Sequence, residues 1–454
     1  MGRALPDGAV VTDPDVLAQY AGDESEVAPR LPAAAVRVSG TEEVAVVMRA
    51  ASAHGVPVTA RGGGTGRAGG AVPAGGGIVI VFERMASIRG VEREEMIAVA
   101  EPGVLTGTLH AAAEAEGLFY PPDPNSWNTC TIGGNVATNA GGPRAFKYGV
   151  TREYVLGLEI VTAAGEVLRL GRRTRKGVTG YDLTALLVGS EGTLGVVTEA
   201  TLKLVPSPEA VATLLVLLAE ESAIERTIAA AIERRVVPRC IELLDAHTLD
   251  VVRPEAAVPI PASARAMLIV ELDGEAESLD AAVERCGGAM QDAGALEVLV
   301  ARHGGDRERL WSARREMSRS LRKLARNKAS EDIVVPRMRI GELLERCRGI
   351  SAEVGIRMPA YGHAGDGNIH VNFLWDDPGE RERVERGRRR LLEATIAMGG
   401  TLTGEHGLGE LKADYLPLEQ SEPLIALQRS LKSVFDPQGI LNPGKILPTA
   451  HGPC

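Results

Sequence analysis

Two short motifs in the last quarter of the chain hold the residues best suited to build a reactive centre. YGHAGDGNIHVNF contains His363 and His370, and TGEHGLG contains Glu405 and His406. Two imidazoles and a carboxylate suit zinc or another first-row divalent ion, and they leave coordination positions open for a substrate. The same residues would also suit a strand histidine and a loop Glu-His pair that are satisfied by hydrogen bonds. No contiguous HExxH motif decides between these two interpretations.

The spacing within these motifs indicates how the side chains could meet. In IHVNF, apolar residues alternate with His370 and Asn372, so on a strand the two polar side chains share one face. Seven residues separate His363 from His370, which would place them on opposite faces of one continuous strand. The intervening GDG predicts a turn, and a turn lets both imidazoles converge. Glu405 and His406 are adjacent between glycines, so one can face an ion and the other a substrate.

Three glycine-rich segments form a second group of candidate binding residues. They are RGGGTGRAGG at 61–70, TIGGNVATNAGG at 131–142 and GSEGTLGVVTEATLKLVP at 189–206. Their unhindered backbone N–H groups can bind a diphosphate without cationic side chains. One such loop alone would be interpreted as a tight turn, whereas three in one region favour a large cofactor.

Two sequences match nucleotide-binding motifs only in spelling. GTGRAG at 64–69 reads as GxGxxG, but the glycines and Pro73 that follow forbid the helix that a dinucleotide fingerprint requires. GILNPGK at 439–445 resembles the start of a phosphate loop, but Ile446 replaces the magnesium-binding Ser or Thr. We therefore expect neither a Rossmann-type NAD site nor a nucleotide triphosphatase.

The motifs are embedded in an alternation of predicted strands and helices. TEEVAVVMRAASAHG predicts a helix that is capped by Thr41 and ends at Gly55. Strands are predicted at VPVTA, GIVIVF, MIAVAEPG and GLEIVTAAGEVLRL, the last as a hairpin about Ala164–Gly165. Beyond Pro206–Pro208, TLLVLLAE and MLIVELDG alternate with helices, and a basic helix is predicted from Arg307 to Lys328. This alternation predicts a separate α+β domain.

Composition narrows the class of protein. A chain of 454 residues implies two or three domains, and its net charge of −10 argues against sequence-independent nucleic-acid binding. The five cysteines form no CxxC, which argues against an iron–sulfur cluster and for a reducing compartment. The start has no apolar signal core, and the longest apolar run, Ala210 to Ala219, is about half of a membrane span. We expect a cytoplasmic protein without a transmembrane segment, which could still associate peripherally with the inner membrane through partners.

At this point the motifs resemble a known family over about residues 28–448. The glycine-rich segments, together with PPDPNSWNTC and KYGVTREYVLGLEIV, resemble the FAD-binding domain of the vanillyl-alcohol-oxidase type flavoproteins. HxGDGNxHxN and GEHG resemble its FAD-linked 2-hydroxy-acid branch: the glycolate oxidase flavoprotein subunit, D-lactate dehydrogenase and D-2-hydroxyglutarate dehydrogenase. The resemblance implies an α+β fold with a two-subdomain FAD-binding domain at 28–206. A cap domain with an antiparallel sheet and the metal site would follow at 207–412, and a C-terminal segment at 413–454 would return to the FAD domain.

The resemblance also implies which residues bind FAD. No histidine stands between Arg61 and Gly70, so the covalent tether found in many relatives is missing and non-covalent FAD is implied. The residues that match the family's FAD segments are Arg61, Gly62, Gly63, Gly64, Thr65, Gly66, Gly69, Gly70, Pro122, Ser126, Thr131, Gly133, Gly134, Asn135, Asn139, Ala140, Gly141, Gly142, Glu191, Gly192, Gly195, Val196 and Asn442.

For the reacting centre, the resemblance assigns separate roles. It implies that His363, His370 and Glu405 bind a divalent metal, zinc or manganese, that His406 is the catalytic base, and that Asn372 contacts the substrate. In the implied reaction the ion lowers the pKa of the 2-hydroxyl and His406 takes its proton. The α-hydrogen then leaves as hydride to the flavin N5.

A guanidinium is expected to bind the substrate carboxylate. LWSARRE resembles the family segment that supplies it and places Arg314 there, with Arg315 as the adjacent alternative. Most basic residues of this stretch would still be solvated surface. Lys328 is nearest to the family's substrate-binding lysine, but its spacing to Pro336 departs from the dicarboxylate enzymes. We therefore expect glycolate or D-lactate rather than D-2-hydroxyglutarate.

The electron acceptor and the partners follow from the missing nicotinamide motif. We expect electrons to leave to a protein or quinone-linked acceptor. One alternative is an FAD oxidase that reacts directly with oxygen. Another is a flavoprotein subunit of a multi-subunit glycolate oxidase that turns over only with iron–sulfur partner subunits. A homodimer is compatible with each of these hypotheses.

Overall fold

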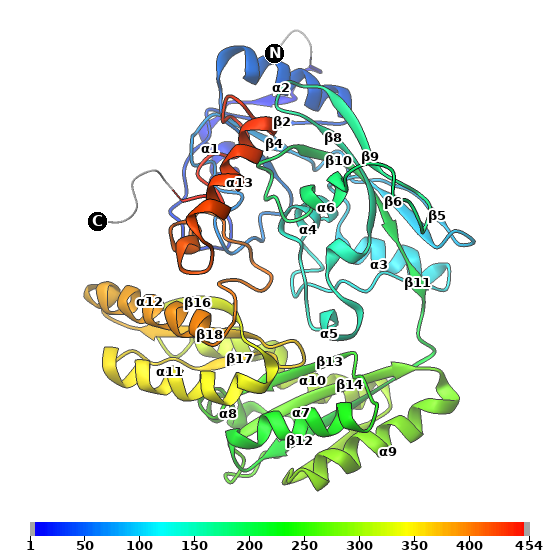
Figure 1. Cartoon of the computed structure of the whole chain (residues 1–454), viewed down its shortest axis with the longest axis vertical. Helices are drawn as coiled ribbons and strands as arrows, with labels where there is room; N and C mark the ends of the chain where they lie inside the picture. Colours follow the sequence, from blue (N-terminus) through cyan, green and yellow to red (C-terminus); the bar gives the residue numbers. More distant parts are fainter. Residues whose placement is uncertain (1–4, 449–454) are drawn as a thin grey trace. The chain divides into compact units, whose positions relative to one another are not determined.

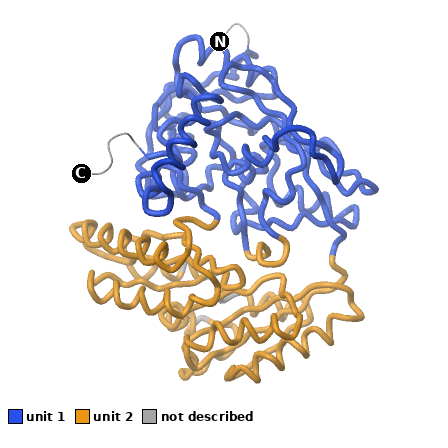
Figure 2. The backbone as a smooth tube through the Cα atoms, in the orientation of Figure 1, with its two compact units in different colours: residues 1–142, 149–207, 405–454 blue, residues 143–148, 208–404 orange. Residues whose placement is uncertain are grey.

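The structure, a computed structural model, describes residues 5–448. Within this range it does not describe the side chains of seven residues, six of which lie on one helix. These residues form two compact units, which are coloured separately in Figure 2. Unit 1 contains residues 5–142, 149–207 and 405–448, and unit 2 contains residues 143–148 and 208–404. The chain returns from unit 2 to unit 1 between Gly404 and Glu405, eight residues before the boundary predicted between residues 412 and 413. The reason is that the backbone N–H groups of Glu410 and Leu411 already donate to Ala68 O of unit 1.

The first sheet of unit 1 has four strands in the order β1-β2-β4-β3. Figure 1 labels the two central strands, β2 and β4. Its strands are β1 Val10–Val11, β2 Ala34–Arg37, β3 Val58–Arg61 and β4 Ile78–Val81; β4 lies parallel to both β2 and β3. Helix α2, Thr41–His54, packs its apolar stripe on this sheet and ends at Gly55 with φ 62°. The prediction that Thr41 caps α2 was wrong, because Gly40 is the N-cap and the Thr41 hydroxyl donates to Glu159 at 2.6 Å.

The second sheet of unit 1 is antiparallel, with the order β5-β6-β10-β8-β9. Its strands are β5 Ile88–Glu92, β6 Ile97–Ala100, β8 Val155–Val161, β9 Val167–Gly171 and β10 Val196–Lys203. The predicted hairpin is β8 and β9, joined through Gly165 at φ 79°. The short strands β7 Leu118–Phe119 and β11 Val205–Pro206 pair with each other, and the helices of this part include α3 Thr106–Ala115, α4 Ile132–Thr138 and α6 Leu183–Leu187.

After helix α13, Glu422–Phe435, the C-terminal segment of unit 1 rejoins the first sheet. The N–H of Val58 donates to Ile440 O, and the N–H of Asn442 donates to Val58 O, both at 2.8 Å. These two bonds place Leu441 beside β3, so residues 440–442 lie next to the strand that leads into the first glycine-rich segment.

Unit 2 is built on a seven-stranded antiparallel sheet in the order β15-β12-β14-β13-β17-β18-β16. The strands are β12 Ala210–Leu218, β13 Cys240–Leu244, β14 Ala266–Gly274, β15 Glu297–Ala301, β16 Asn327–Val334, β17 Ala360–His363 and β18 Asn368–Trp375. Each pair of neighbours is antiparallel, so every strand exposes alternate residues on the two faces. The two α+β units confirm the predicted fold class.

Helices cover both faces of this sheet. Helices α8 Ala246–Val252 and α10 Gly304–Arg322 pack on one face, where they share an apolar cluster with Leu215, Leu244 and Tyr361. Helices α9 Ala276–Asp292 and α12 Arg381–Ala397 pack on the other face, with α7 Ile224–Glu233 and α11 Ile340–Val354 beside them. The prediction that the basic helix ends at Lys328 was wrong. Helix α10 stops at Arg322, and Lys328 lies in β16, paired with β18.

Candidate functional site

The two histidines of YGHAGDGNIHVNF meet on one face of the unit 2 sheet. Strands β17 and β18 form a hairpin in which Tyr361 pairs with His370 and His363 pairs with Asn368. The GDG between them is the predicted turn, with Gly367 at φ 86°. The two imidazole ring centroids lie 5.4 Å apart, and both side chains are buried. The turn therefore brings the imidazoles together, as the sequence predicts.

A buried carboxylate on the neighbouring strand contacts both His363 and Arg314. Glu242 lies directly opposite His363 in the pairing of β13 with β17 and is fully buried. Its Oε2 accepts from Arg314 Nε at 2.6 Å, and its Oε1 hydrogen-bonds His363 Nδ1. Burial alone would raise the pKa of Glu242, but the charges and hydrogen bonds of His363 and Arg314 outweigh it and hold that pKa below its usual value. Glu242 is therefore an anion here.

A second buried carboxylate accompanies His370. Asp332 lies opposite His370 in the pairing of β16 with β18, and its Oδ1 is 3.7 Å from His370 Nδ1. Asp332 also accepts from Asn368 Nδ2 at 2.7 Å, from Thr403 Oγ1 at 2.8 Å and from the Gly404 N–H at 2.9 Å. Because Glu405 follows Gly404 directly, Asp332 fixes the start of the TGEHG motif to unit 2.

Asn372 adds an unsatisfied acceptor to the same face. Its Nδ2 donates to His370 O at 3.1 Å, whereas its Oδ1 has no hydrogen-bond partner among the residues that the structure describes. A buried oxygen without a partner is costly, so a site that retains one indicates a missing ligand or water. Ser330 lies opposite Asn372, and Lys328 lies opposite Leu374, two residues farther from the histidines along β16. Lys328 therefore shares the face but lies at its far end.

Contacts with Tyr361 and Glu242, both among the described residues, help to position Arg314 on this face. Its guanidinium carbon lies 4.8 Å from the centre of the Tyr361 ring, and its Nε is bound by Glu242. Only 7% of Arg314 is exposed, so it is not one of the solvated basic residues of α10. The side chain of the alternative, Arg315, lies outside the described residues.

The donor set of unit 2 fits a divalent metal ion. A histidine ligand usually binds metal through one nitrogen while a carboxylate or carbonyl holds the other. Glu242 binds Nδ1 of His363, which leaves Nε2 of the same ring to bind the ion. Glu405 and His406 belong to unit 1, where Glu405 Oε1 lies 3.7 Å from His406 Nε2, and both side chains are mostly buried. Their roles as ligand and base stay predictions.

The predicted FAD segments converge within unit 1. A Cβ on Gly62 would lie 2.4 Å from Thr131 Oγ1, and one on Gly63 would lie 2.2 Å from Thr129 O. The first glycine-rich segment thus packs on the second at backbone distance, which only glycine allows. The third segment joins them, because the N–H groups of Gly189 and Glu191 donate to the carbonyls of the second segment at 2.9 and 2.8 Å. This cradle of small residues and backbone N–H groups fits a diphosphate cofactor.

Glu191 and Asn442 tie the segments of unit 1 together. Asn442 Nδ2 donates to Gly70 O at 2.9 Å and to Glu191 O at 2.7 Å. The Glu191 carboxylate accepts from the N–H groups of Leu408 and Gly409, each at 2.9 Å, which lie just after the GEHG motif. Burial raises the pKa of Glu191 to about 7, although these N–H groups and Lys445 oppose the rise. Direct contact of Glu191 and Asn442 with FAD stays a prediction.

Two buried acids of the site, Glu242 and Asp332, were missed by the sequence reasoning. Glu242 lies in the strand sequence CIELL, and Asp332 lies in SEDIVV. Burying a charged residue in a strand is costly unless it is paired, so such a residue indicates a partner or a ligand. The partners themselves were not visible, because Glu242 is 121 residues from His363 in the sequence.

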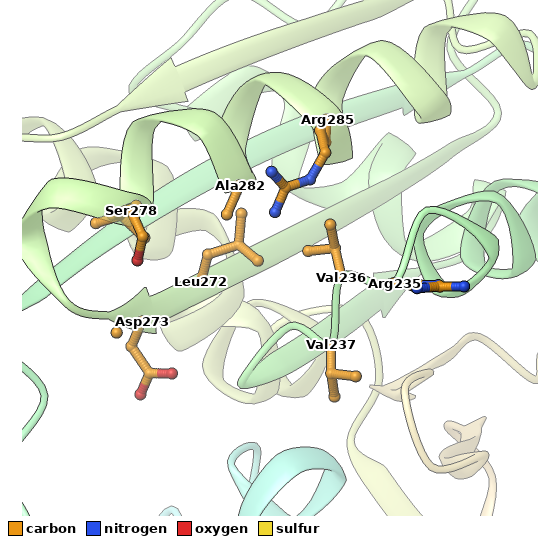
Figure 3. A pocket seen from close by; sticks show the side chains of 10 residues that line it. Arg235, Val236, Val237, Leu272, Asp273, Ser278, Ala282 and Arg285 are labelled. Atoms are coloured by element: carbon orange, nitrogen blue, oxygen red, sulfur yellow. The ribbon is translucent and has the colours of Figure 1, made fainter.

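A pocket on unit 2 lies apart from these residues. Figure 3 shows it between α9 and the end of β14, where Asp273, Ser278 and Arg285 line it together with Arg235 and Val237. Its lining residues include neither of the two histidines, neither Glu242 nor Asp332, and none of the predicted substrate residues. It is therefore not the candidate site.

Comparisons with known proteins give the relationships of the chain. The family described as "FAD binding domain" matches residues 32–171, and "FAD linked oxidases, C-terminal domain" matches residues 207–446. The chain is 41% identical over 429 residues to "Glycolate oxidase subunit GlcD" of Bacillus subtilis, covering 94% of this chain and 91% of the relative. It is 36% identical to "D-lactate dehydrogenase" of Anaerostipes hadrus, covering 91% and 89%, and 33% identical to "D-2-hydroxyglutarate dehydrogenase" of Stutzerimonas stutzeri, covering 97% and 96%.

Solved structures resemble the fold at lower sequence identity. A p-cresol methylhydroxylase with bound substrate matches with a TM-score of 0.82 at 18% identity, covering 98% of this chain and 95% of the other. A 4-ethylphenol oxidase from Gulosibacter chungangensis matches with a TM-score of 0.78 at 21% identity, covering 96% and 94%. Within residues 5–448, no helix combines the length and apolar character needed to cross a membrane.

Proposed function

The chain belongs to the family of FAD-linked oxidases, and from this premise we propose that it oxidises a small D-2-hydroxy acid, glycolate or D-lactate, to the 2-oxo acid with FAD and a divalent metal ion. The relatives named for glycolate, D-lactate and D-2-hydroxyglutarate all act on 2-hydroxy acids, which supports the substrate class. The single observation that carries the proposal is one face of the unit 2 sheet. There the two imidazoles and an unsatisfied amide oxygen lie on the adjacent strands β17 and β18, and a guanidinium from helix α10 is bound to a buried carboxylate on β13.

FAD would be held by the glycine-rich segments of unit 1. The backbone N–H groups of these segments would bind the diphosphate, and Gly62 and Gly63 leave no room for a side chain between the first two segments. The divalent ion would be held by His363, His370 and Glu405, with Glu242 and Asp332 bound to or facing the two imidazoles. When bound, FAD would accept the hydride and the ion would lower the pKa of the substrate hydroxyl.

The remaining steps belong to side chains of this chain. Arg314 would bind the substrate carboxylate, since its plane is fixed by Glu242 and Tyr361. The unsatisfied Oδ1 of Asn372 would accept a hydrogen bond from a donor on the substrate or on a bound water. His406 would take the proton of the 2-hydroxyl, because an imidazole exchanges protons near neutral pH.

A screen of four 2-hydroxy acids for anaerobic reduction of the bound flavin tests this proposal. Anaerobic mixing of the FAD-loaded protein with glycolate or D-lactate should bleach the flavin absorbance, and L-lactate should not. D-2-hydroxyglutarate is the rival substrate, and faster bleaching by this diacid would replace the proposed substrate while keeping the reaction class. Bleaching by none of these acids would contradict the proposal. Reoxidation in air separates the two enzyme types, since a fast return of the absorbance indicates an oxidase and a slow return a dehydrogenase.

The proposed base has its own test. His406→Ala should slow flavin reduction by about 10²–10⁴-fold, because proton transfer by a positioned group is lost. The bound flavin's spectrum should stay unchanged. Reduction of this variant at the wild-type rate would remove His406 from the mechanism. Assays of the purified chain with an artificial dye show whether turnover requires iron–sulfur partner subunits.

A further inference from the structure

We propose that Glu242 is a positioning residue that couples the metal ligand His363 to the substrate-binding Arg314, an inference that rests on the proposed function. One carboxylate makes both contacts: Oε1 with His363 Nδ1, and Oε2 with Arg314 Nε at 2.6 Å. All three side chains are buried, at 0%, 2% and 7% exposure, so water does not compete for these bonds. The position of either partner therefore depends on the same two oxygens.

The contact with His363 determines which imidazole nitrogen carries the hydrogen. A carboxylate only accepts hydrogen bonds, so Nδ1 must be the protonated nitrogen when it binds Glu242. Nε2 then offers its lone pair to the ion, which is the usual arrangement of a carboxylate–histidine–metal unit. Because Glu242 is paired directly with His363 across β13 and β17, the sheet itself fixes this geometry.

The contact with Arg314 determines the plane of the guanidinium. Its Nε donates to Glu242, and its guanidinium carbon lies 4.8 Å from the Tyr361 ring centre, so two sides of the group are fixed. A planar guanidinium held at Nε presents its terminal donors in one orientation, and that orientation suits a bidentate carboxylate. Glu242 thus prepares the carboxylate-binding group at the same time as the metal ligand.

A neutral isostere cannot make both contacts. Glutamine has one acceptor oxygen and one NH₂ group in place of two oxygens. If its oxygen accepts from His363, its NH₂ faces the donors of Arg314; if it accepts from Arg314, its NH₂ donates to Nδ1 and moves the hydrogen of His363 to Nε2. The Glu242→Gln variant must therefore disturb Arg314 or His363, although its shape is unchanged.

The sheet offers a matched control. Glu271 on the adjacent strand β14 is also buried and also binds arginine. It accepts from Thr213 Oγ1 at 2.9 Å and Trp311 Nε1 at 3.1 Å, and it pairs with Arg239 at 3.2 Å and Arg307 at 3.3 Å. None of these four partners is a candidate site residue. Glu271→Gln therefore reproduces the cost of burying a glutamine beside an arginine in this sheet without changing the proposed coupling.

Two binding measurements and one spectroscopic measurement test the coupling. Zn²⁺ affinity is measured by calorimetry, and oxalate, an anion without an α-hydrogen, is titrated against the flavin spectrum. Glu242→Gln should weaken Zn²⁺ binding about 10–100-fold, as expected for the loss of an outer-shell carboxylate, or weaken oxalate binding by a similar factor. Glu271→Gln should change neither. Unchanged binding of both probes by a folded Glu242→Gln protein would overturn the coupling.

The wild-type protein gives an answer even if Glu242→Gln does not fold. In the zinc-loaded protein, ¹⁵N spectra of the imidazoles, assigned with His363→Gln, should show hydrogen on Nδ1 of His363 and metal on Nε2. The reverse arrangement overturns the coupling alone and leaves the proposed function standing. Failure of the wild type to bind Zn²⁺ or Mn²⁺ overturns the coupling together with the metal part of the proposed function. Absence of 2-hydroxy-acid oxidation with the expected nitrogens overturns only the proposed function.

Discussion

Unit 1 and unit 2 differ in the part of the polypeptide that they offer to a ligand. Unit 1 offers backbone N–H groups in three glycine-rich segments, which pack so closely that a single added Cβ would collide with the next segment. Unit 2 offers side chains from adjacent strands, held by the buried carboxylates Glu242 and Asp332. The first site should therefore be sensitive to added volume, and the second to lost charge.

The largest effect is expected from a buried ion pair on the opposite face of the unit 2 sheet. Arg388 on α12 donates to Glu331 at 2.5 Å, and both side chains are almost fully buried. Arg388→Met leaves Glu331 charged and without its main partner, so it should lower the free energy of unfolding by about 3–5 kcal/mol. Urea unfolding followed by circular dichroism measures this loss.

The adjacent residue provides the control for that prediction. Arg389 forms an exposed pair with Glu393, and exposed pairs contribute about 0–1 kcal/mol. Arg389→Met should therefore unfold almost as the wild type does. Equal stability of the two variants would contradict the view that buried charge pairs hold unit 2.

A pH dependence is expected in unit 1 from Glu191. Its pKa is raised to about 7 in the folded protein, against about 4.5 when unfolded, because of burial. The folded state therefore binds more protons in this window, and its stability is full below pH 4.5 and falls as the pH rises through 7, by at most about 3 kcal/mol. Glu191→Gln removes this contribution.

The measurement compares the FAD-free wild type and Glu191→Gln by urea unfolding from pH 5 to pH 8. The variant should gain stability relative to the wild type as the pH rises. A difference that stays constant over this range would show that Glu191 does not titrate in it.

A smaller effect is expected from added volume in the first glycine-rich segment. Gly63→Ala places a Cβ against the backbone oxygen of Thr129, and such overpacking costs about 1–3 kcal/mol. Gly90→Ala is the control, because Gly90 lies in β5 outside the predicted FAD segments and its added Cβ would meet no atom within 4 Å beyond its chain neighbours. The ratio of flavin to protein absorbance should fall in Gly63→Ala and not in Gly90→Ala. Equal FAD content in both would argue against a close-packed cradle.

The same difference explains what could be predicted from the sequence. Glycine-rich segments and the GDG turn are local patterns, so the cradle and the meeting of His363 with His370 were predictable. Glu242 was not, because its role depends on β13 lying beside β17, and strand order is not a local property. The helix predicted to Lys328 failed for a related reason: pairing of β16 with β18 overrides the helical propensity of a basic stretch.

The contacts of Glu191 and Asn442 were also beyond what the sequence could predict. The resemblance assigned Glu191 and Asn442 to the cofactor, and that assignment stays a prediction. The structure adds that both residues bind backbone groups of other segments in unit 1. Residues that lie 251 positions apart in the chain make these contacts. Their part in holding the cradle together therefore could not be read from spacing.

Flavin reduction before and after metal removal tests the proposed metal-assisted oxidation most directly. The FAD-loaded protein is treated with a chelator, freed of it, and mixed anaerobically with glycolate or D-lactate. Bleaching should be lost in the metal-free protein while the flavin stays bound, and added Zn²⁺ or Mn²⁺ should restore it. Undiminished bleaching in protein shown to contain no metal would contradict the proposed role of His363, His370 and Glu405.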